Sequence, residues 1–131
     1  MVSPAAGGQG GAAARTIYIP SVDCPFCQRL SGELLGENAL AAAFFDGYPV
    51  SPGHCLVVPR RHEADFFALS RDEQAAVWAL AAEVRAGLGA GRRPDGYNIG
   101  INVGTAAGQT VSHAHLHVIP RYRGDVPDPR G

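Results

Sequence analysis

The feature that most constrains this chain is a set of three histidines at every second position, His113, His115 and His117. Successive side chains of a β-strand point to opposite faces, so a strand would place all three imidazoles on one face. The apolar residues that alternate with them are of the kind that fills a core: Ala114, Leu116 and Val118. On a helix the three histidines would fan around the axis instead. We therefore predict a strand here, and we expect Pro120 to end it.

Two kinds of chemistry suit a row of imidazoles on one face: metal binding, and phosphorus chemistry with a histidine nucleophile. The outer two histidines would lie about 13 Å apart along a strand, whereas a zinc–nitrogen bond is about 2 Å long. Two neighbouring imidazoles can lean onto one ion, but three in a row are difficult to bring together. At least one histidine is therefore expected to be left over. The alternative is that the three histidines only line a solvent-exposed face of the sheet. Their strict alternation disfavours this alternative.

Composition limits the classes of protein that this chain can belong to. Its 131 residues suffice for one domain with a modest core, and 46% hydrophobic with 18% charged residues fits a globular protein. A net charge of −1 marks no broad surface for a nucleic-acid polymer or a membrane. No apolar run is long enough to span a bilayer, and the N-terminus lacks the pattern of a signal peptide. We therefore expect a cytoplasmic protein that binds neither nucleic-acid polymers nor membranes.

Two of the three cysteines form a Cys-x-x-Cys motif, Cys24 and Cys27. A redox dithiol would need a thioredoxin-like βαβ pattern around it, and none is evident. A zinc half-site would need two more ligands, which the histidines could supply. The third possibility is a pair of ordinary buried thiols; we favour zinc over it. Pro25 suits the first turn of a short helix that reaches about Leu30, and Cys55 is expected to be a small core residue.

Other elements follow from local patterns. Short strands are predicted at residues 16–19, 34–35, 40–45, 54–59 and 97–103, with a turn at Glu37 and Asn38. Ser70 to Glu73 is a capping-box pattern, which predicts a helix to about Leu88, closed by Gly87 and Gly89. We expect a Gly/Ala-rich disordered tail at 1–15, a single domain at 16–125 and a C-terminal tail at 126–131.

The loop before the histidine strand, residues 104–110, holds two glycines, two threonines and a glutamine. These could offer N–H and O–H donors to phosphate oxygens. Such loops are common, but its position directly before three histidines strengthens a phosphate interpretation. The turn at Arg60, Arg61 and His62 could be solvated or could face an anionic ligand, and the sequence leaves this open.

Together these residues resemble the histidine triad family. The resemblance rests on the motif at 113–119, on the stretch from Asp46 to His54, and on Gly96-Tyr97-Asn98, Asn102-x-Gly104 and 107–110. These motifs cover about residues 24–125 in the family's order. They imply an α+β fold with an antiparallel sheet of about five strands, a long helix and a short N-terminal helix, usually as a homodimer. Gly-Asp after Pro-Arg-Tyr resembles the dinucleoside polyphosphate hydrolases of the fragile-histidine-triad type.

The resemblance also implies catalytic roles. His115 would attack an α-phosphorus to form a nucleotidyl-histidine, His117 would contact phosphate oxygens, and His54 would assist proton handling. Imidazole is largely neutral at pH 7 and therefore nucleophilic. A covalent intermediate divides one difficult displacement into two easier ones.

Substrate-binding roles follow in the same way. Gln109 and Thr110 would hold phosphate oxygens or the leaving group, Asn102 would orient phosphate, and Asp46 would accept hydrogen bonds from ribose hydroxyls. Some relatives place a branched apolar residue directly after this aspartate, whereas this chain has Gly47. That leaves base preference open, with Tyr48 or Phe26 as possible compensation.

In bacterial relatives with Cys-x-x-Cys, two cysteines and two histidines hold a structural zinc. Here the resemblance assigns that role to Cys24, Cys27, His62 and His113, which leaves the middle histidine free. The expected activity is hydrolysis or transfer of a nucleoside 5′-phosphoryl group from a dinucleoside polyphosphate or a nucleoside phosphoramidate. The alternatives are a non-catalytic nucleotide-binding module and a metalloenzyme with His115 and His117 as ligands.

Overall fold

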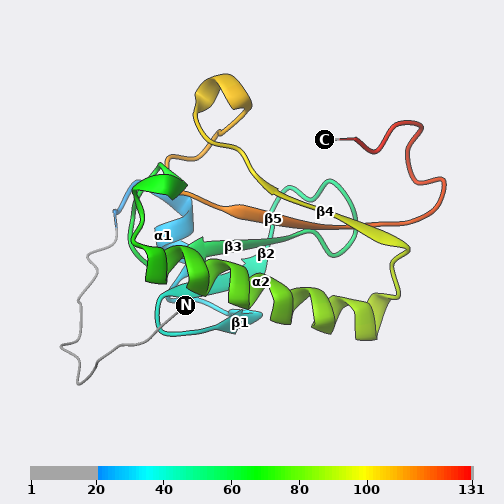
Figure 1. Ribbon diagram of the computed structural model, residues 1–131, viewed down its shortest axis with the longest axis horizontal. Helices are drawn as coiled ribbons and strands as arrows, with labels where there is room; N and C mark the ends of the chain where they lie inside the picture. The colour runs from blue at the N-terminus through cyan, green and yellow to red at the C-terminus, as the bar shows by residue number, and fades with distance from the viewer. Residues whose placement is uncertain (1–20, 131) are drawn as a thin grey trace.

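The protein forms a five-stranded antiparallel sheet with one long helix across one face (Figure 1). The computed structural model describes residues 21–130. Its α-helices are α1 (Pro25–Arg29) and α2 (Arg71–Arg92), and its strands are β1 (Gly36–Glu37), β2 (Ala41–Phe45), β3 (Cys55–Pro59), β4 (Gly96–Ile101) and β5 (Leu116–Arg121). The strand order is β1-β2-β3-β5-β4. This confirms the expected α+β fold with five antiparallel strands, a long helix and a short N-terminal helix.

The two faces of the sheet bury different clusters because side chains alternate along each strand. Val57, Leu116 and Val118 join the main core, which α2 covers with Val77, Leu80 and other residues of its apolar stripe. On the opposite face a smaller cluster forms around Phe44, Leu56 and Val58, with Phe26 packed against it. His117 pairs directly with Leu56 across the β3–β5 ladder, so it lies on this second face. The histidines therefore lie on the side of the sheet that α2 leaves uncovered.

The first hairpin differs from the prediction by a few residues. The expected strand at 34–35 lies instead at Gly36–Glu37, so Glu37 is a strand residue and not part of the turn. The turn is made by Asn38, whose Oδ1 accepts hydrogen bonds from the backbone N–H groups of Leu40 and Ala41 at 3.0 and 2.8 Å. An asparagine that bonds its own backbone needs no second turn residue before it.

Helix α2 begins as its capping box predicts. The Ser70 hydroxyl accepts a hydrogen bond from the Glu73 N–H at 3.0 Å, and the Glu73 carboxylate accepts one from the Ser70 N–H at 2.9 Å. Glu73 is buried and pairs with Arg61 through contacts of 2.9 and 3.0 Å. Burial alone would raise the pKa of Glu73, but hydrogen bonds from Arg61 and the Ser70 backbone hold it below its ordinary value. The pair ties the start of α2 to the turn after β3.

Replacing Glu73 with alanine removes the carboxylate half of the capping box and one charged partner of Arg61. We expect Glu73→Ala to lower the free energy of unfolding by about 2 kcal/mol, because the Ser70 backbone N–H loses its acceptor and the half-buried Arg61 guanidinium loses one of its acceptors. Glu83→Ala, at an exposed position of the same helix, should change it by less than about 0.5 kcal/mol. Urea denaturation of the three proteins measures this, and equal losses in both variants would contradict the role of Glu73.

The end of α2 was predicted wrongly. The helix continues past Gly87 and Gly89 to Arg92 and ends at Arg93, whose φ of 50° is left-handed. A Cβ on Gly89 would lie 3.3 Å from the Tyr97 hydroxyl, so this glycine serves close packing against β4 and does not end the helix. The stop is Pro94, which disfavours a helical conformation in the residue before it.

The histidine strand also begins and ends later than expected. β5 starts at Leu116, so His113 and His115 precede it in irregular backbone. Pro120 does not end β5: it pairs with Tyr97 of β4, whereas the β3 pairing ends at Val118. A proline is tolerated there because only one neighbouring strand remains.

Several predictions lie outside the described residues. These are the disordered tail at 1–15 and the strand at 16–19, and the domain division at 16–125 stays a prediction with them. Within residues 21–130, neither helix combines the length and the apolar character that crossing a membrane requires.

Candidate active site and metal centre

Four potential metal ligands meet at one end of the sheet. Cys24 caps α1 and Cys27 lies within it, and the two sulfurs face His62 from the turn after β3 and His113. The ligand atoms of all four lie within 4.8 Å of one another. The Cys27 sulfur is 3.3 Å from Nδ1 of His62 and 3.5 Å from Nδ1 of His113. Segments separated by up to 89 positions in the sequence converge here.

The donor set fits a zinc ion. Two thiolates and two imidazole nitrogens in a close cluster are the ligands of structural tetrahedral zinc. His113 is fully buried, and its Nε2–H donates to the Pro59 carbonyl at 2.8 Å, which leaves the Nδ1 lone pair for the cluster. A second hydrogen bond of this kind orients metal-bound histidines generally. A five-residue helix such as α1 is too short to be stable by itself, so a metal would hold it in place.

The middle histidine is held in one tautomer. Its Nδ1–H donates to the backbone carbonyl of His113 at 2.8 Å. Nε2 of His115 therefore carries the lone pair, which makes this atom the nucleophilic nitrogen of the ring. The ring is 5% exposed and packs between the edges of Phe26 and His117, with ring centres 4.9 and 5.0 Å away. His115 is thus both immobilised and partly desolvated.

A chain of hydrogen bonds fixes the other two imidazoles. The backbone N–H of Val50 donates to Nδ1 of His54 at 3.0 Å, so neutral His54 carries its proton on Nε2. That proton is shared between Nδ1 of His117, at 2.9 Å, and a carboxylate oxygen of Asp46, at 3.4 Å. His117 must then carry its own proton on Nε2. Its free N–H is available as a donor to a phosphate oxygen.

These hydrogen bonds also determine whether a second cluster of possible ligands can hold a metal. Asp46, His54 and His117 bring three ligand atoms within 4.8 Å of one another. A metal there would need a lone pair on Nε2 of His54, but the Val50 N–H already occupies the lone pair of Nδ1. A neutral imidazole has only one lone pair. The trio is therefore built to share a proton.

Burial keeps these imidazoles neutral. It lowers the pKa of His54 and lowers that of His117 to about 4, and the neighbouring His115 acts in the same direction on both. Because the folded value lies below the ordinary value of about 6.5, the unfolded chain binds the proton first as the pH falls. The contribution of neutral His117 to stability is therefore complete above pH 6.5 and is lost between pH 6.5 and about 4.

We expect His117→Gln to weaken this pH dependence. The free energy of unfolding of the original chain should fall from pH 7 to pH 4.5 by about 1–2 kcal/mol more than that of His117→Gln, after allowance for solvent screening. Urea denaturation at both pH values measures the difference. Parallel pH profiles in the two proteins would show that His117 does not titrate in this way.

A cleft of about 370 Å³ opens over the second face of the sheet. His54, His115 and His117 line it, together with Asp46 and Thr110. The Asp46 carboxylate accepts the Tyr48 N–H at 2.8 Å and keeps further acceptor capacity toward the cleft. The structure therefore brings five of the predicted site residues to one cavity.

Two predicted phosphate ligands lie elsewhere. Gln109 is buried; it donates from Nε2 to the carbonyls of Ala64 and Val111, and its oxygen accepts the Gly104 N–H. Its side chain thus organises the loop from within. Asn102 donates to the Ala107 carbonyl and lines a separate groove beside His117. Their roles toward phosphate stay predictions.

Sequence reasoning missed two contributors to the cleft. Val50 acts through its backbone N–H, which no side-chain pattern reveals. Arg29 lines the cleft from the end of α1. It lies outside every motif considered, so only its position in the fold identifies it.

Comparisons with known proteins agree with this geometry. The family model of the HIT domain matches residues 29–124. The adenosine 5′-monophosphoramidase of Schizosaccharomyces pombe is 38% identical over 76% of this chain and 75% of its own length. An AP-4-A phosphorylase of Mycobacterium tuberculosis is 34% identical over 82% of this chain and 55% of its own length. A zinc-bound histidine triad family protein from Mycobacterium smegmatis superimposes with a TM-score of 0.73 at 34% identity, covering 82% of this chain and 81% of that one.

Proposed function

This chain belongs to the HIT domain family, and on that premise we propose that it is a nucleotidyl hydrolase or transferase. Its substrate would be a nucleoside 5′-phosphoryl compound, either a dinucleoside polyphosphate or a nucleoside phosphoramidate. The observation that carries the proposal is the state of His115: its Nδ1–H is bound to the His113 carbonyl, so Nε2 is a free nucleophile at the cleft. Relatives named as a phosphoramidase and as an AP-4-A phosphorylase support both substrate classes.

The first step would proceed by in-line displacement. Nε2 of His115 attacks the α-phosphorus, a nitrogen–phosphorus bond forms, and the bond from phosphorus to the leaving group breaks. The Nε2–H of His117 donates to a phosphate oxygen and stabilises the charge that develops there. The Asp46 carboxylate, beside His54, is placed to accept from ribose hydroxyls. These contacts divide one displacement into two steps with His115 as the intermediate carrier.

The second step would release the nucleotide. Water, or a phosphate acceptor, attacks the phosphorus of the nucleotidyl-histidine and returns the lone pair to Nε2 of His115. When the leaving group is an amine, it takes a proton from the chain of His117 and His54 in the first step, and the attacking water or phosphate returns a proton to this chain in the second. Water as acceptor yields a nucleoside monophosphate, and orthophosphate yields the diphosphate.

A turnover assay tests the proposal. Purified protein is offered diadenosine tetraphosphate, diadenosine triphosphate and adenosine 5′-phosphoramidate, each with and without orthophosphate. We expect release of AMP without phosphate; formation of ADP from the phosphoramidate only when phosphate is present would identify a transferase. If AMP binds while none of the three substrates is consumed, the cleft belongs to a non-catalytic binding module.

We propose that the cluster of Cys24, Cys27, His62 and His113 holds a structural zinc. The ion would fix α1 against the strand that follows His115 and would take no part in bond cleavage. The likeness to a zinc-bound family member supports this assignment together with the donor set.

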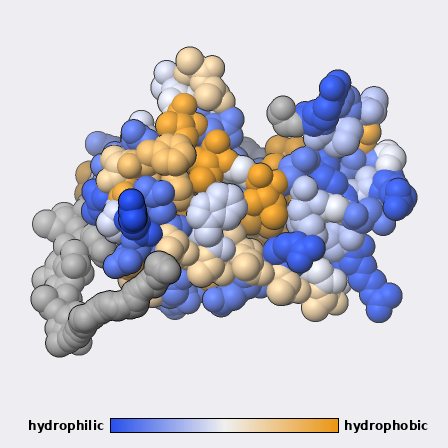
Figure 2. Space-filling view, viewed as in Figure 1, coloured by the Kyte–Doolittle hydropathy of each residue, from blue (hydrophilic) through white to orange (hydrophobic). Residues whose placement is uncertain are grey.

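We also propose that the protein is a homodimer. In the described part of the chain β4 has a partner strand on one side only, and it carries partly exposed apolar residues such as Ile99. Figure 2 shows apolar residues gathered over the middle of the face that carries α2. An open edge with apolar residues favours pairing with another copy. Sedimentation should give about twice 13.7 kDa, and a monomer at micromolar concentration would contradict the dimer.

A further inference from the structure

Arg29 occupies one end of the cleft in an unusual position for a charged side chain. Its guanidinium lies 4.3 Å from the ring centre of Phe44, and its Nη2 donates to the Phe45 carbonyl at 3.0 Å. Both contacts restrict the side chain, because a cation over an aromatic face is held by the ring quadrupole. Its remaining N–H groups are available at a cleft that it helps to line. Arg29 is thus a fixed donor at the wall of a cavity.

A series of ring contacts shows where along the cleft this donor lies. His115 packs on Phe26 at 4.9 Å, Phe26 packs on Phe44 at 5.6 Å, and Phe44 carries Arg29. Arg29 is therefore separated from the nucleophile by two aromatic rings. The carbonyl that it binds belongs to Phe45, the residue before Asp46, where the ribose is proposed to lie. A nucleotide attached to His115 with its ribose at Asp46 would direct its base toward this end.

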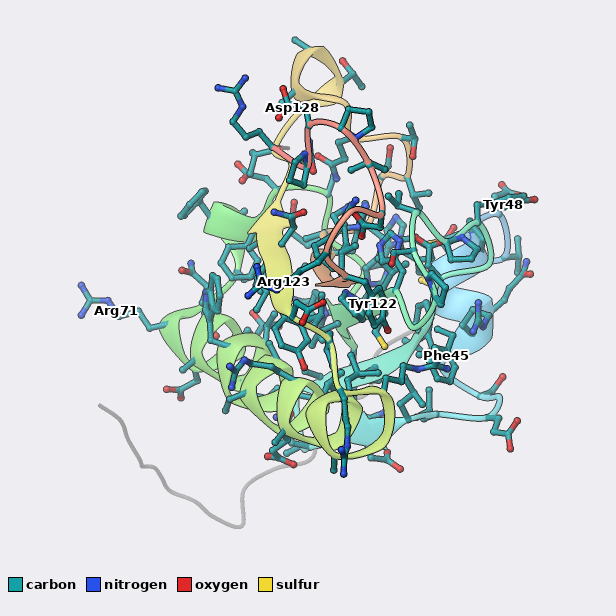
Figure 3. The ribbon with its side chains drawn as sticks, turned by 90° about the vertical axis from the view of Figure 1, so that its right-hand side faces the viewer. Phe45, Tyr48, Arg71, Tyr122, Arg123 and Asp128 are labelled. Carbon is teal, nitrogen blue, oxygen red and sulfur yellow. The ribbon has the colours of Figure 1, made fainter. Side chains whose placement is uncertain are left out.

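The same end of the cleft is open. A Cβ built on Gly47 would meet no atom within 4 Å, so this glycine leaves space where a larger side chain would stand. Tyr48 is 92% exposed, and Figure 3 shows it projecting outward on the same side of the molecule as Phe45. The end of the cleft toward which the base would point therefore has free space, with the Tyr48 ring at its margin and the Arg29 guanidinium at its wall.

We propose that Arg29 is the residue that selects the base, and that it favours guanine over adenine. This inference rests on the proposed function for the site, and it adds the identity of the nucleoside. Guanine presents two adjacent acceptors, O6 and N7, to a guanidinium, which has several donors in a fixed fork. Adenine presents N7 beside an N6 amino group, whose hydrogens face the donors of arginine without an acceptor. Each good paired contact of this kind discriminates strongly against the wrong base.

Titration calorimetry with GMP and AMP tests the inference without requiring turnover. The original protein should bind GMP about tenfold more tightly than AMP. Arg29→Met keeps an apolar stem over Phe44 but removes the donors, so it should abolish the preference mainly by weakening GMP. Arg85→Met is the matched control, because Arg85 also lies over an aromatic ring, that of Tyr97 at 5.0 Å, but is not among the residues that line the cleft. It should keep the tenfold ratio.

Arg29→Lys guards against misfolding of the methionine variant. It keeps the charge and loses the fork, so the ratio should fall toward one while the melting temperature is retained. An unchanged ratio in both Arg29 variants would overturn the inference, as would an equal loss for GMP and AMP, which indicates a phosphate contact. Turnover of the adenosine substrates in the assay above, together with equal affinity for GMP and AMP, would overturn the base assignment alone. A preference for GMP without turnover would instead contradict the proposed enzyme.

Discussion

His115→Ala should abolish nucleotidyl transfer while leaving the fold intact. We expect the turnover rate on the preferred substrate to fall on the order of 10⁴-fold or more, because the attacking atom itself is removed. Among the three imidazoles that line the cleft, His115 is the one whose lone pair the surrounding hydrogen bonds leave free: Nδ1 of His54 accepts from Val50, and Nδ1 of His117 accepts from His54. Neither His54 nor His117 can replace His115 as the nucleophile without breaking these hydrogen bonds.

Trapping the nucleotidyl-histidine intermediate tests the role of His115 more directly than the turnover rate does. Rapid acid-free quenching of the original protein with a substrate labelled at the α-phosphorus should trap label on His115, and the label should be lost on mild acid treatment. Ser112→Ala, at an exposed position in the same segment, should turn over and label like the original protein. Full activity in His115→Ala, or label on a different residue, would contradict the assignment of the nucleophile.

The variant His115→Gly, which removes the whole side chain, provides a further control. It leaves room for free imidazole beside Phe26 and His117, the two rings that pack on His115. Added imidazole should restore part of the turnover if the variant lacks only its nucleophile. Absence of rescue together with a lowered melting temperature would show that the ring is needed mainly for packing.

Cys27→Ser should remove the metal and destabilise the chain. Cys27 contacts both histidines of the cluster, so its loss leaves three ligands, of which only Cys24 is a thiolate. A metal held at about a thousand times its dissociation constant contributes about 4 kcal/mol to stability. We therefore expect Cys27→Ser, or chelation of the original protein, to lower the free energy of unfolding by about 4 kcal/mol.

The third cysteine is a matched control. Cys55 is buried, and its thiol donates to the Gly53 carbonyl at 3.1 Å, away from the cluster. Burial raises its pKa to about 11, so it remains a neutral thiol. Cys55→Ser should keep one zinc per chain in elemental analysis, whereas Cys27→Ser should lose it. Zinc retained by Cys27→Ser, or no zinc in the purified original protein, would contradict the assignment.

The same substitution tests whether the metal site positions the nucleophile. His113 offers Nδ1 to the cluster, and its backbone carbonyl accepts the Nδ1–H of His115. Phe26, between the two cysteines in the sequence, packs against the His115 ring. Loss of the metal should therefore also release His115, which NMR of the histidine ring nitrogens can follow as a loss of its fixed tautomer.

Local patterns in the sequence predicted the elements whose causes are local. The capping box at Ser70 and Glu73 begins α2 as expected, and Pro25 begins α1. The alternation around Leu116 and Val118 predicted a strand with one core face, since a period of two has no other regular interpretation. At the glycines near the end of α2 the local signal was misleading: Gly89 leaves room for the Tyr97 hydroxyl, and the helix continues to Arg92.

Histidine spacing alone also limited the chemistry, because three alternating imidazoles are difficult to bring onto one ion. The choice among them required the tertiary structure. The Pro59 carbonyl turns Nδ1 of His113 toward the cysteines, and the His113 carbonyl leaves Nε2 of His115 free. Backbone groups carry no residue identity, so a sequence does not reveal them as partners.

The sequence by itself therefore determined the residue types and the period: three alternating histidines that lead into a strand, a Cys-x-x-Cys pair and an aspartate before a Pro/Gly-rich loop, with the α+β fold implied by the resemblance to the histidine triad family. Only the tertiary structure decided which atoms meet. It joined Cys24 to His113 across 89 positions and placed Arg29 at the open end of the cleft. It also placed the Gln109 side chain where it bonds the Ala64 carbonyl and stabilises the loop before the histidines. The physical reason is that a tautomer, a ligand set and a cavity wall depend on contacts between distant segments, whereas helix caps and strand periods depend on neighbours.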